Sequence, residues 1–127
     1  MGQAISEERH AILIVEDEAF IRYDLVDFFE DAGFQVFDAE NADVAIELMA
    51  ANPSIRIVLT DVDMPGSMDG VRLAHVIRDR YPPTLLLIAS GARKLEQGDM
   101  PPGATFIAKP FDPRSLLSRI REAGLPS

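Results

Sequence analysis

Short apolar segments recur five times along the chain, separated by stretches with helical periodicity. The runs AILIV and TLLLIA are almost wholly apolar, which is typical of strands covered on both faces. FQVFDA instead alternates between apolar and polar residues, which favours a strand near the edge of a sheet. The five predicted strands lie at residues 11–15, 34–39, 57–60, 84–89 and 105–108.

The stretches between the strands place apolar residues at the spacing of one helix face. Asn41 and Asp112 stand where caps of the second and the last helix are expected, and Pro113 suits a first turn. Gly33 favours the left-handed stop of the first helix. In that helix the residues expected to face inward are Ile21, Leu25, Phe28, Phe29 and Ala32.

The connection from 90 to 104 differs from the others because it holds three glycines and two prolines. Any helix there is expected to be limited to a turn or two around Arg93 to Gln97. A fourth helix that is short or irregular is therefore predicted.

Alternating strands and helices predict an α/β fold with a doubly wound parallel sheet of five strands and helices on both faces. In such folds ligands bind beyond the carboxyl ends of the strands. Candidate functional residues are therefore sought directly after each strand.

Composition limits the class of protein. With 127 residues, 47% of them apolar, we expect one domain over residues 11–124 after a flexible tail of residues 1–10. The tail lacks the apolar core of a signal peptide, which favours a cytoplasmic protein, and no apolar run approaches the roughly 18 residues of a membrane span. The formal charge of −9, without a basic stripe, argues against nucleic-acid binding.

Polar residues follow the strands. Taken singly, each has an ordinary explanation, such as a helix-dipole partner, a turn cap or a surface lysine. Together they would meet at one edge of the sheet. They are Glu16, Asp17, Glu40, Asn41, Asp61, Asp63, Ser90 and Lys109.

Carboxylates brought to one edge repel one another and require a cation or raised pKa values. Mg²⁺ suits such a group because it prefers oxygen ligands and is commonly held by one or two carboxylates plus a phosphate. Asp61 can act as a nucleophile that forms an acyl phosphate. Phosphoryl transfer then needs its charge neutralised, by the metal on one side and Lys109 on the other.

Four motifs resemble those of the receiver domains of two-component response regulators, the CheY-like superfamily: ILIVEDE, VLTDVDMPGSMDG, IASG and FIAKPF. The resemblance covers about Ala11 to Gly124. It implies a flavodoxin-like sheet with strand order 2-1-3-4-5. The implied partners are a histidine kinase or histidine phosphotransfer protein as phosphodonor and a protein that receives the signal.

The resemblance also implies roles for individual residues. Asp61 is the phosphorylated residue, and Glu16 and Asp17 hold the metal together with Asp61 and the backbone carbonyl of Asp63. Lys109 binds the phosphoryl group and precedes a cis peptide bond to Pro110. Ser90 is the favoured switch hydroxyl, with Ala89 as the alternative occupant of that position, and Phe106 is the switch aromatic.

Two departures from the family pattern affect the site. Ser67 resembles a one-residue insertion in the phosphoacceptor loop, which would reshape the loop over the site. The other departure is the short fourth helix. We expect the output surface to be formed by residues 105–108, the last helix and the proline-rich segment before them, because Ser90 and Lys109 connect this surface to the phosphate and Phe106 lies within it.

Two other functions remain open. IVLTDVDMP also resembles the DxD motif of haloacid-dehalogenase-type phosphatases, which would make the chain an enzyme rather than a signalling module. In that family, however, the acidic pair lies far downstream of the DxD motif, whereas here it lies upstream. A receiver that is never phosphorylated and acts only as a scaffold is the other alternative.

Overall fold

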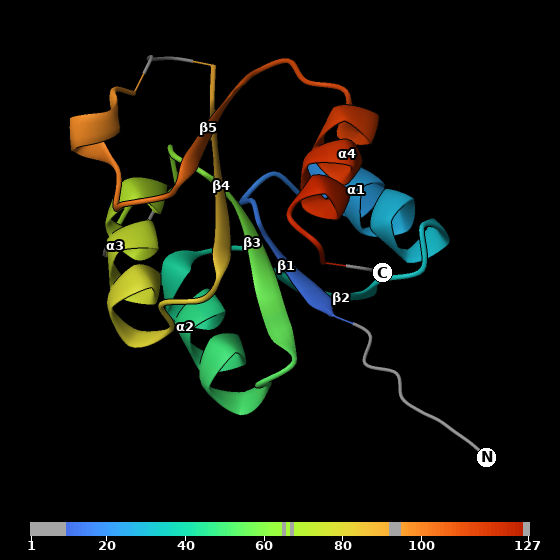
Figure 1. The fold of residues 1–127 in the computed structure, drawn as a ribbon, viewed down its shortest axis with the longest axis horizontal. Helices are drawn as coiled ribbons and strands as arrows, with labels where there is room; N and C mark the ends of the chain where they lie inside the picture. The colour runs from blue at the N-terminus through green and yellow to red at the C-terminus, as the bar shows by residue number, and fades with distance from the viewer. Residues whose placement is uncertain (1–9, 65, 67, 92–94, 126–127) are drawn as a thin grey trace.

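The computed structural model describes residues 10–64, 66, 68–91 and 95–125. Five strands form one sheet in the order β2-β1-β3-β4-β5, and every neighbouring pair is parallel (Figure 1). This confirms the predicted doubly wound sheet, with the alternating strand at one edge. The strands are β1 Ala11–Val15, β2 Gln35–Ala39, β3 Ile55–Asp61, β4 Leu85–Ser90 and β5 Thr105–Ala108.

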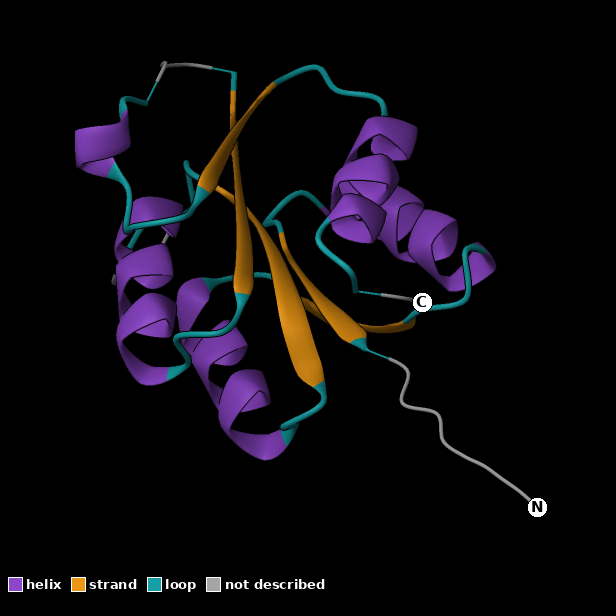
Figure 2. Ribbon diagram, viewed as in Figure 1, coloured by secondary structure: helices purple, strands orange, loops and turns teal. Residues whose placement is uncertain are grey.

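Helices cover both faces of this sheet (Figure 2). The pair α2 and α3 lies on one face, and the pair α1 and α4 on the other (Figure 1). None of the described helices is long and apolar enough to cross a membrane. Their bounds are α1 Ala19–Asp31, α2 Ala42–Ala51, α3 Gly70–Arg80 and α4 Pro113–Glu122.

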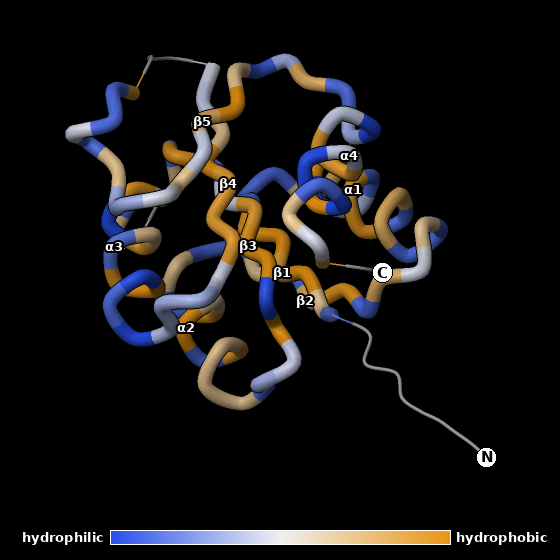
Figure 3. Tube along the Cα trace, viewed as in Figure 1, coloured by the Kyte–Doolittle hydropathy of each residue, from blue (hydrophilic) through white to orange (hydrophobic). Residues whose placement is uncertain are grey.

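Two apolar clusters separate the sheet from its helices, and the central strands are the most hydrophobic part of the trace (Figure 3). All five residues of β1 are buried, as expected for a strand covered on both faces. The cluster under α2 and α3 includes Leu13, Val58, Leu73, Ile77 and Ile88. The cluster under α1 and α4 includes Ile12, Ile14, Phe29, Leu87 and Leu116.

The segment between β4 and β5 contains only a short 3-10 helix, η1 Gln97–Asp99, in the part that the structure describes. This confirms the prediction of a short or irregular fourth helix, although η1 lies slightly later than expected and residues 92–94 are outside the described part. Leu95 and Met100 are each only 6% exposed and pack into the cluster under α2 and α3. Burial of these two side chains holds the segment against the sheet.

Side chains of α3 also contact this segment. The Nε of Arg78 donates to the carbonyl of Pro102 at 2.9 Å, and its Nη1 donates to the carbonyls of Pro82 and Thr84. The Nε2 of His75 lies 3.2 Å from the carbonyl oxygen of Asp99. The segment is therefore fastened to α3 by side chains at two points.

The predicted helix caps are confirmed. The side chain of Asn41 accepts a hydrogen bond from the amide of Val44 at 2.9 Å, and that of Asp112 accepts one from Arg114 at the same distance. Each cap satisfies an amide that has no partner within its own helix.

The face that α1 buries differs from the one predicted by the apolar spacing. Its buried residues are Arg22, Leu25 and Phe29, whereas Ile21 is 40% exposed. The prediction for Leu25 and Phe29 is confirmed, and that for Ile21 is wrong. The reason is that Arg22 takes the buried position, where it binds a backbone carbonyl and a carboxylate at the sheet.

The start of α3 packs directly against the end of β3. The amide of Gly70 donates to the carbonyl of Val62 at 2.9 Å. A Cβ built on Gly70 would lie 1.9 Å from the carbonyl oxygen of Asp61, so no larger residue fits here without movement of that strand end. Gly70 thus allows the close approach that fixes the backbone of Asp61.

Replacing Gly70 by Ala should therefore destabilise the protein by about 1–3 kcal/mol, the usual cost of overpacking. The free energy of unfolding from urea denaturation measures this. Gly98→Ala is the matched control, because a Cβ on Gly98 meets nothing within 4 Å, and its effect should stay within about 0.5 kcal/mol. Equal stability of the two variants would contradict the packing role of Gly70.

Candidate metal centre at the carboxyl ends of the strands

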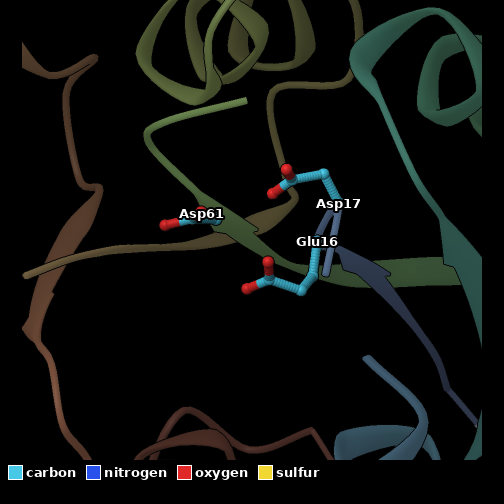
Figure 4. Close-up of side chains that lie close together, drawn as sticks. All are labelled: Glu16, Asp17 and Asp61. Atoms are coloured by element: carbon cyan, nitrogen blue, oxygen red, sulfur yellow. The ribbon is translucent and has the colours of Figure 1, made fainter. Parts of the chain in front are cut away.

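Three carboxylates meet where β1 and β3 end. Glu16 and Asp17 follow β1, Asp61 is the last residue of β3, and their carboxylates extend toward the same side of these strands (Figure 4). One oxygen from each lies within 4.8 Å of the others. Parallel pairing of β1 with β3 produces this arrangement, since Val15 lies opposite Thr60 and the following residues leave the sheet together.

Lys109 brings positive charge to the same place from the end of β5. Its Nζ lies 3.0 Å from Oδ1 of Asp61 and 3.4 Å from Oε1 of Glu16. The amide of Lys109 also donates to the carbonyl of Ser90 at 3.1 Å, which holds the residue beside the end of β4. The peptide bond from Lys109 to Pro110 is cis, as the family resemblance implies.

Burial raises the pKa of the Glu16 carboxyl above its usual value, because desolvation disfavours the charged form. The nearby charge of Asp61 adds to the increase. A hydrogen bond from the amide of Glu18, at 3.0 Å, and the charge of Lys109 oppose it without cancelling it.

Burial on its own would lower the pKa of Lys109. The hydrogen bond to Asp61 and the negative charges of Glu16 and Asp61 outweigh burial, so the pKa of this amine lies above its usual value. The ammonium form is therefore stabilised by the acids that it contacts.

The other residues implicated by sequence lie at different depths around this cluster. Asp63 is exposed, and its carboxylate is not one of the three that converge. Ser90 is 2% exposed at the end of β4, one residue beyond Ala89, which pairs with Asp61 in the sheet register. Phe106 lies on β5 opposite Ile88 and is partly buried against the cluster under α2 and α3.

The loop over the site is described only in part. Ser67, the expected insertion, lies outside the described residues. The roles of Asp63, Ser90 and Phe106 in binding or switching stay predictions, because they concern contacts with a metal or a phosphoryl group.

Arg22 is a neighbour of the site that the sequence reasoning missed. Its Nη1 donates to the backbone carbonyl of Glu16 at 2.7 Å, and its Nε donates to Oδ2 of Asp38 at 2.9 Å. The sequence contains a feature that indicates this role. Arg22 stands three residues before Leu25 and seven before Phe29, on the apolar face of α1. A charged residue in such a row indicates a buried polar partner.

The donor set fits a hard divalent cation. Three carboxylates supply oxygen ligands only, and the described residues within the cluster include no nitrogen or sulfur ligand. Mg²⁺ prefers oxygen ligands, is commonly held by one or two carboxylates and usually retains several waters. One of the three, Asp61, is also the side chain that Lys109 contacts.

A model of the response regulator receiver domain matches residues 12–121. The chain belongs to this family. The match favours a receiver over the haloacid-dehalogenase-type phosphatase that the DxD pattern also resembles. The expected domain limits at residues 11 and 124 stay predictions.

Curated relatives of this receiver domain are larger proteins. It is 36% identical over 117 residues to the response regulator protein FleR of Pseudomonas aeruginosa, covering 90% of this chain and 24% of that protein. It is 34% identical over 112 residues to the transcriptional regulatory protein SrrA of Staphylococcus aureus, covering 87% of this chain and 46% of that protein. The chain thus spans less than half the length of either relative.

Solved structures of receiver domains share the fold along most of their length. A response regulator receiver protein from Sinorhizobium medicae is 30% identical, with a TM-score of 0.83 over 92% of this chain and 95% of that one. A CheY-like receiver domain protein from Methanospirillum hungatei is 26% identical, with a TM-score of 0.80 over 91% and 93%. Both likenesses support the assignment of the fold.

The raised pKa of Glu16 predicts a pH dependence in the metal-free receiver. As pH rises from the usual glutamate value of 4.5 through the raised pKa, the unfolded chain loses this proton before the folded protein does. The free energy of unfolding of the wild type should therefore fall, relative to that of Glu16→Gln, across this window.

Urea denaturation of both proteins with a chelator, between about pH 4 and about pH 7, measures this difference. The comparison with Glu16→Gln removes the contribution of carboxyl groups that do not interact with Glu16. A difference between the two proteins that does not change with pH would contradict the raised pKa.

Proposed function

We propose that this receiver domain is the phosphoacceptor of a two-component phosphorelay and that Asp61 takes the phosphoryl group. The observation that carries the proposal is the position of Asp61, which belongs to a cluster of three carboxylates while its Oδ1 lies 3.0 Å from the ammonium of Lys109. A carboxylate placed between a metal-binding group and a fixed cation suits the attack on phosphorus.

The phosphodonor is the phosphohistidine of a histidine kinase or a histidine phosphotransfer protein. A carboxylate oxygen of Asp61 forms the bond to phosphorus as the bond between phosphorus and the imidazole nitrogen breaks, and the electron pair leaves with the imidazole. The product is an acyl phosphate on Asp61. We also propose that the reaction takes place in the cytoplasm.

The side chains around Asp61 would bind the metal and the phosphoryl group. Glu16, Asp17 and Asp61 would hold Mg²⁺ with the backbone carbonyl of Asp63, and the bound ion supplies charge neutralisation for the phosphoryl oxygens. Lys109 exchanges its present contacts with Asp61 and Glu16 for the phosphoryl group. The hydroxyl of Ser90, from the end of β4, contacts another phosphoryl oxygen.

Phosphorylation then changes the affinity of the chain for another protein. We place the responding surface on β5, α4 and residues 95–104, with Phe106 as its switch aromatic. The amide of Lys109 binds the carbonyl of Ser90, so a displacement of either phosphate-binding residue reaches both strand ends. The chain acts as a signalling phosphoacceptor whose chemistry is limited to its own phosphorylation and dephosphorylation.

Treatment with a small acyl phosphate and Mg²⁺ should add one phosphate, detectable as a mass increase of the intact protein. Asp61→Asn should lose the increase, because an amide does not form the acyl phosphate. Asp79→Asn is the matched control and should keep it, since Asp79 is exposed on α3 and its carboxylate lies outside the converging group. An unchanged mass increase in Asp61→Asn would refute the assignment, and its absence in the wild type would favour a scaffold.

Mg²⁺ should also stabilise the folded protein, because it relieves repulsion that is present only when the three carboxylates converge. At a free concentration one hundred times its dissociation constant, the gain should be about 2.7 kcal/mol. Melting curves at constant ionic strength measure this gain, and Asp61→Asn should reduce it. Identical curves with and without Mg²⁺ would rule out the metal site.

A further inference from the structure

The side chain of Arg22 is nearly buried, with 9% of its surface exposed. It contacts three groups at once. Its Nη1 donates to the carbonyl of Glu16 at 2.7 Å, its Nε donates to Asp38 at 2.9 Å, and its guanidinium carbon lies 5.1 Å from the centre of the Tyr23 ring. A guanidinium with all these contacts has little freedom to move.

The carbonyl that Arg22 binds lies between two of the converging acids. The peptide unit that contains it joins Glu16 to Asp17 and is planar, so its oxygen and the Cα atoms of both residues move together. Holding this oxygen therefore restricts the backbone positions from which both side chains leave the end of β1. The amide of Glu16 is held as well, by the carbonyl of Ala39 at 3.0 Å.

The second contact connects the same guanidinium to the neighbouring strand. Asp38 lies on β2 opposite Ile14 of β1 in the sheet register. The planar guanidinium offers donors in a fixed fork, which allows one side chain to bind the carbonyl after β1 and the carboxylate on β2 in a set geometry. Lysine has no such fork.

We propose that Arg22 is a positioning residue of the metal site. It holds the peptide between Glu16 and Asp17 so that both carboxylates meet Asp61. The role rests on the proposed Mg²⁺-dependent function. Among the described residues, Arg22 contacts the carbonyl of Glu16, the carboxylate of Asp38 and the ring of Tyr23, so it acts on the metal site through the two acids that its carbonyl contact positions.

The two contacts of Arg22 predict different consequences when each is lost. The side chain of Asp38 is 40% exposed, so its ion pair with Arg22 is partly solvated and weak. The hydrogen bond to the carbonyl of Glu16 is buried. Replacing Asp38 by Asn keeps this buried bond, whereas replacing Arg22 by Met removes it.

Calorimetric titration with MgCl₂ tests the role directly on the full chain. Arg22→Met should bind Mg²⁺ about tenfold more weakly, the usual effect of removing a group that orients metal ligands. Asp38→Asn should stay within about twofold of the wild type, because it retains the carbonyl contact. Asp61 phosphorylation in Arg22→Met should be slow at low Mg²⁺ and recover at saturating Mg²⁺.

Arg78→Met is the matched control for lost stability. Arg78 also binds backbone carbonyls, those of Pro82, Thr84 and Pro102. These carbonyls lie just before the amino ends of β4 and β5, whereas the three acids lie at the carboxyl ends of the strands. Arg78→Met should lower the melting temperature and leave the affinity for Mg²⁺ unchanged.

Wild-type affinity in Arg22→Met, or equal loss of affinity in Arg78→Met, would overturn the role of Arg22. If Arg22→Met does not fold, Arg22→Lys replaces it, and wild-type affinity in that variant would overturn the need for the fork. The Mg²⁺ affinity of the wild type distinguishes failure of the proposed function from failure of the role of Arg22. If it does not bind Mg²⁺, the metal-dependent function fails, whereas if wild type and Arg22→Met bind equally, only the role of Arg22 fails.

Discussion

Repulsion among the carboxylates of Glu16, Asp17 and Asp61 is the constraint on which the rest of the site depends. Two such charges about 4 Å apart repel by about 4 kcal/mol at an effective dielectric constant of 20, and the three oxygens lie within 4.8 Å of one another. The metal-free protein offsets this cost in several ways. Lys109 contacts two of the acids, Glu16 accepts a bond from the amide of Glu18, and the pKa of Glu16 rises.

The sheet keeps the three repelling carboxylates close together because the backbone that carries them is tightly packed. β1 is buried along its whole length, and Gly70 brings α3 against the carbonyl of Asp61 without space for a Cβ. The acids are therefore attached to strand ends that are held by the core rather than by the acids themselves. The core therefore keeps the three acids together in spite of the repulsion among their charges.

The α/β class and the position of the acids at the carboxyl ends of the strands were predictable from the sequence, because both follow from periodicity. The strand order, which makes β1 and β3 neighbours and so brings Glu16 and Asp17 to Asp61, came from the family resemblance. Ile21 was placed wrongly because spacing alone does not show that Arg22 has polar partners under α1. The position of η1 was also only approximate, since Leu95 and Met100 decide it by packing against residues distant in sequence. The functional roles of Asp63 and Ser90 depend on contacts made with a ligand, which neither periodicity nor the fold determines.

The segment at residues 95–104 is held against the sheet and α3 mainly by side chains. Leu95 and Met100 are inserted in the core, and His75 and Arg78 contact its backbone, but its only described helix is the three residues of η1. A longer helix resists local unfolding because its backbone bonds break cooperatively. Residues 95–104 have few such bonds, so their local stability depends on the burial of Leu95 and Met100 and on the side-chain contacts from His75 and Arg78 rather than on a helical hydrogen-bond ladder. The part of the β4 to β5 connection that the structure describes is thus ordered by its neighbours and not by its own backbone.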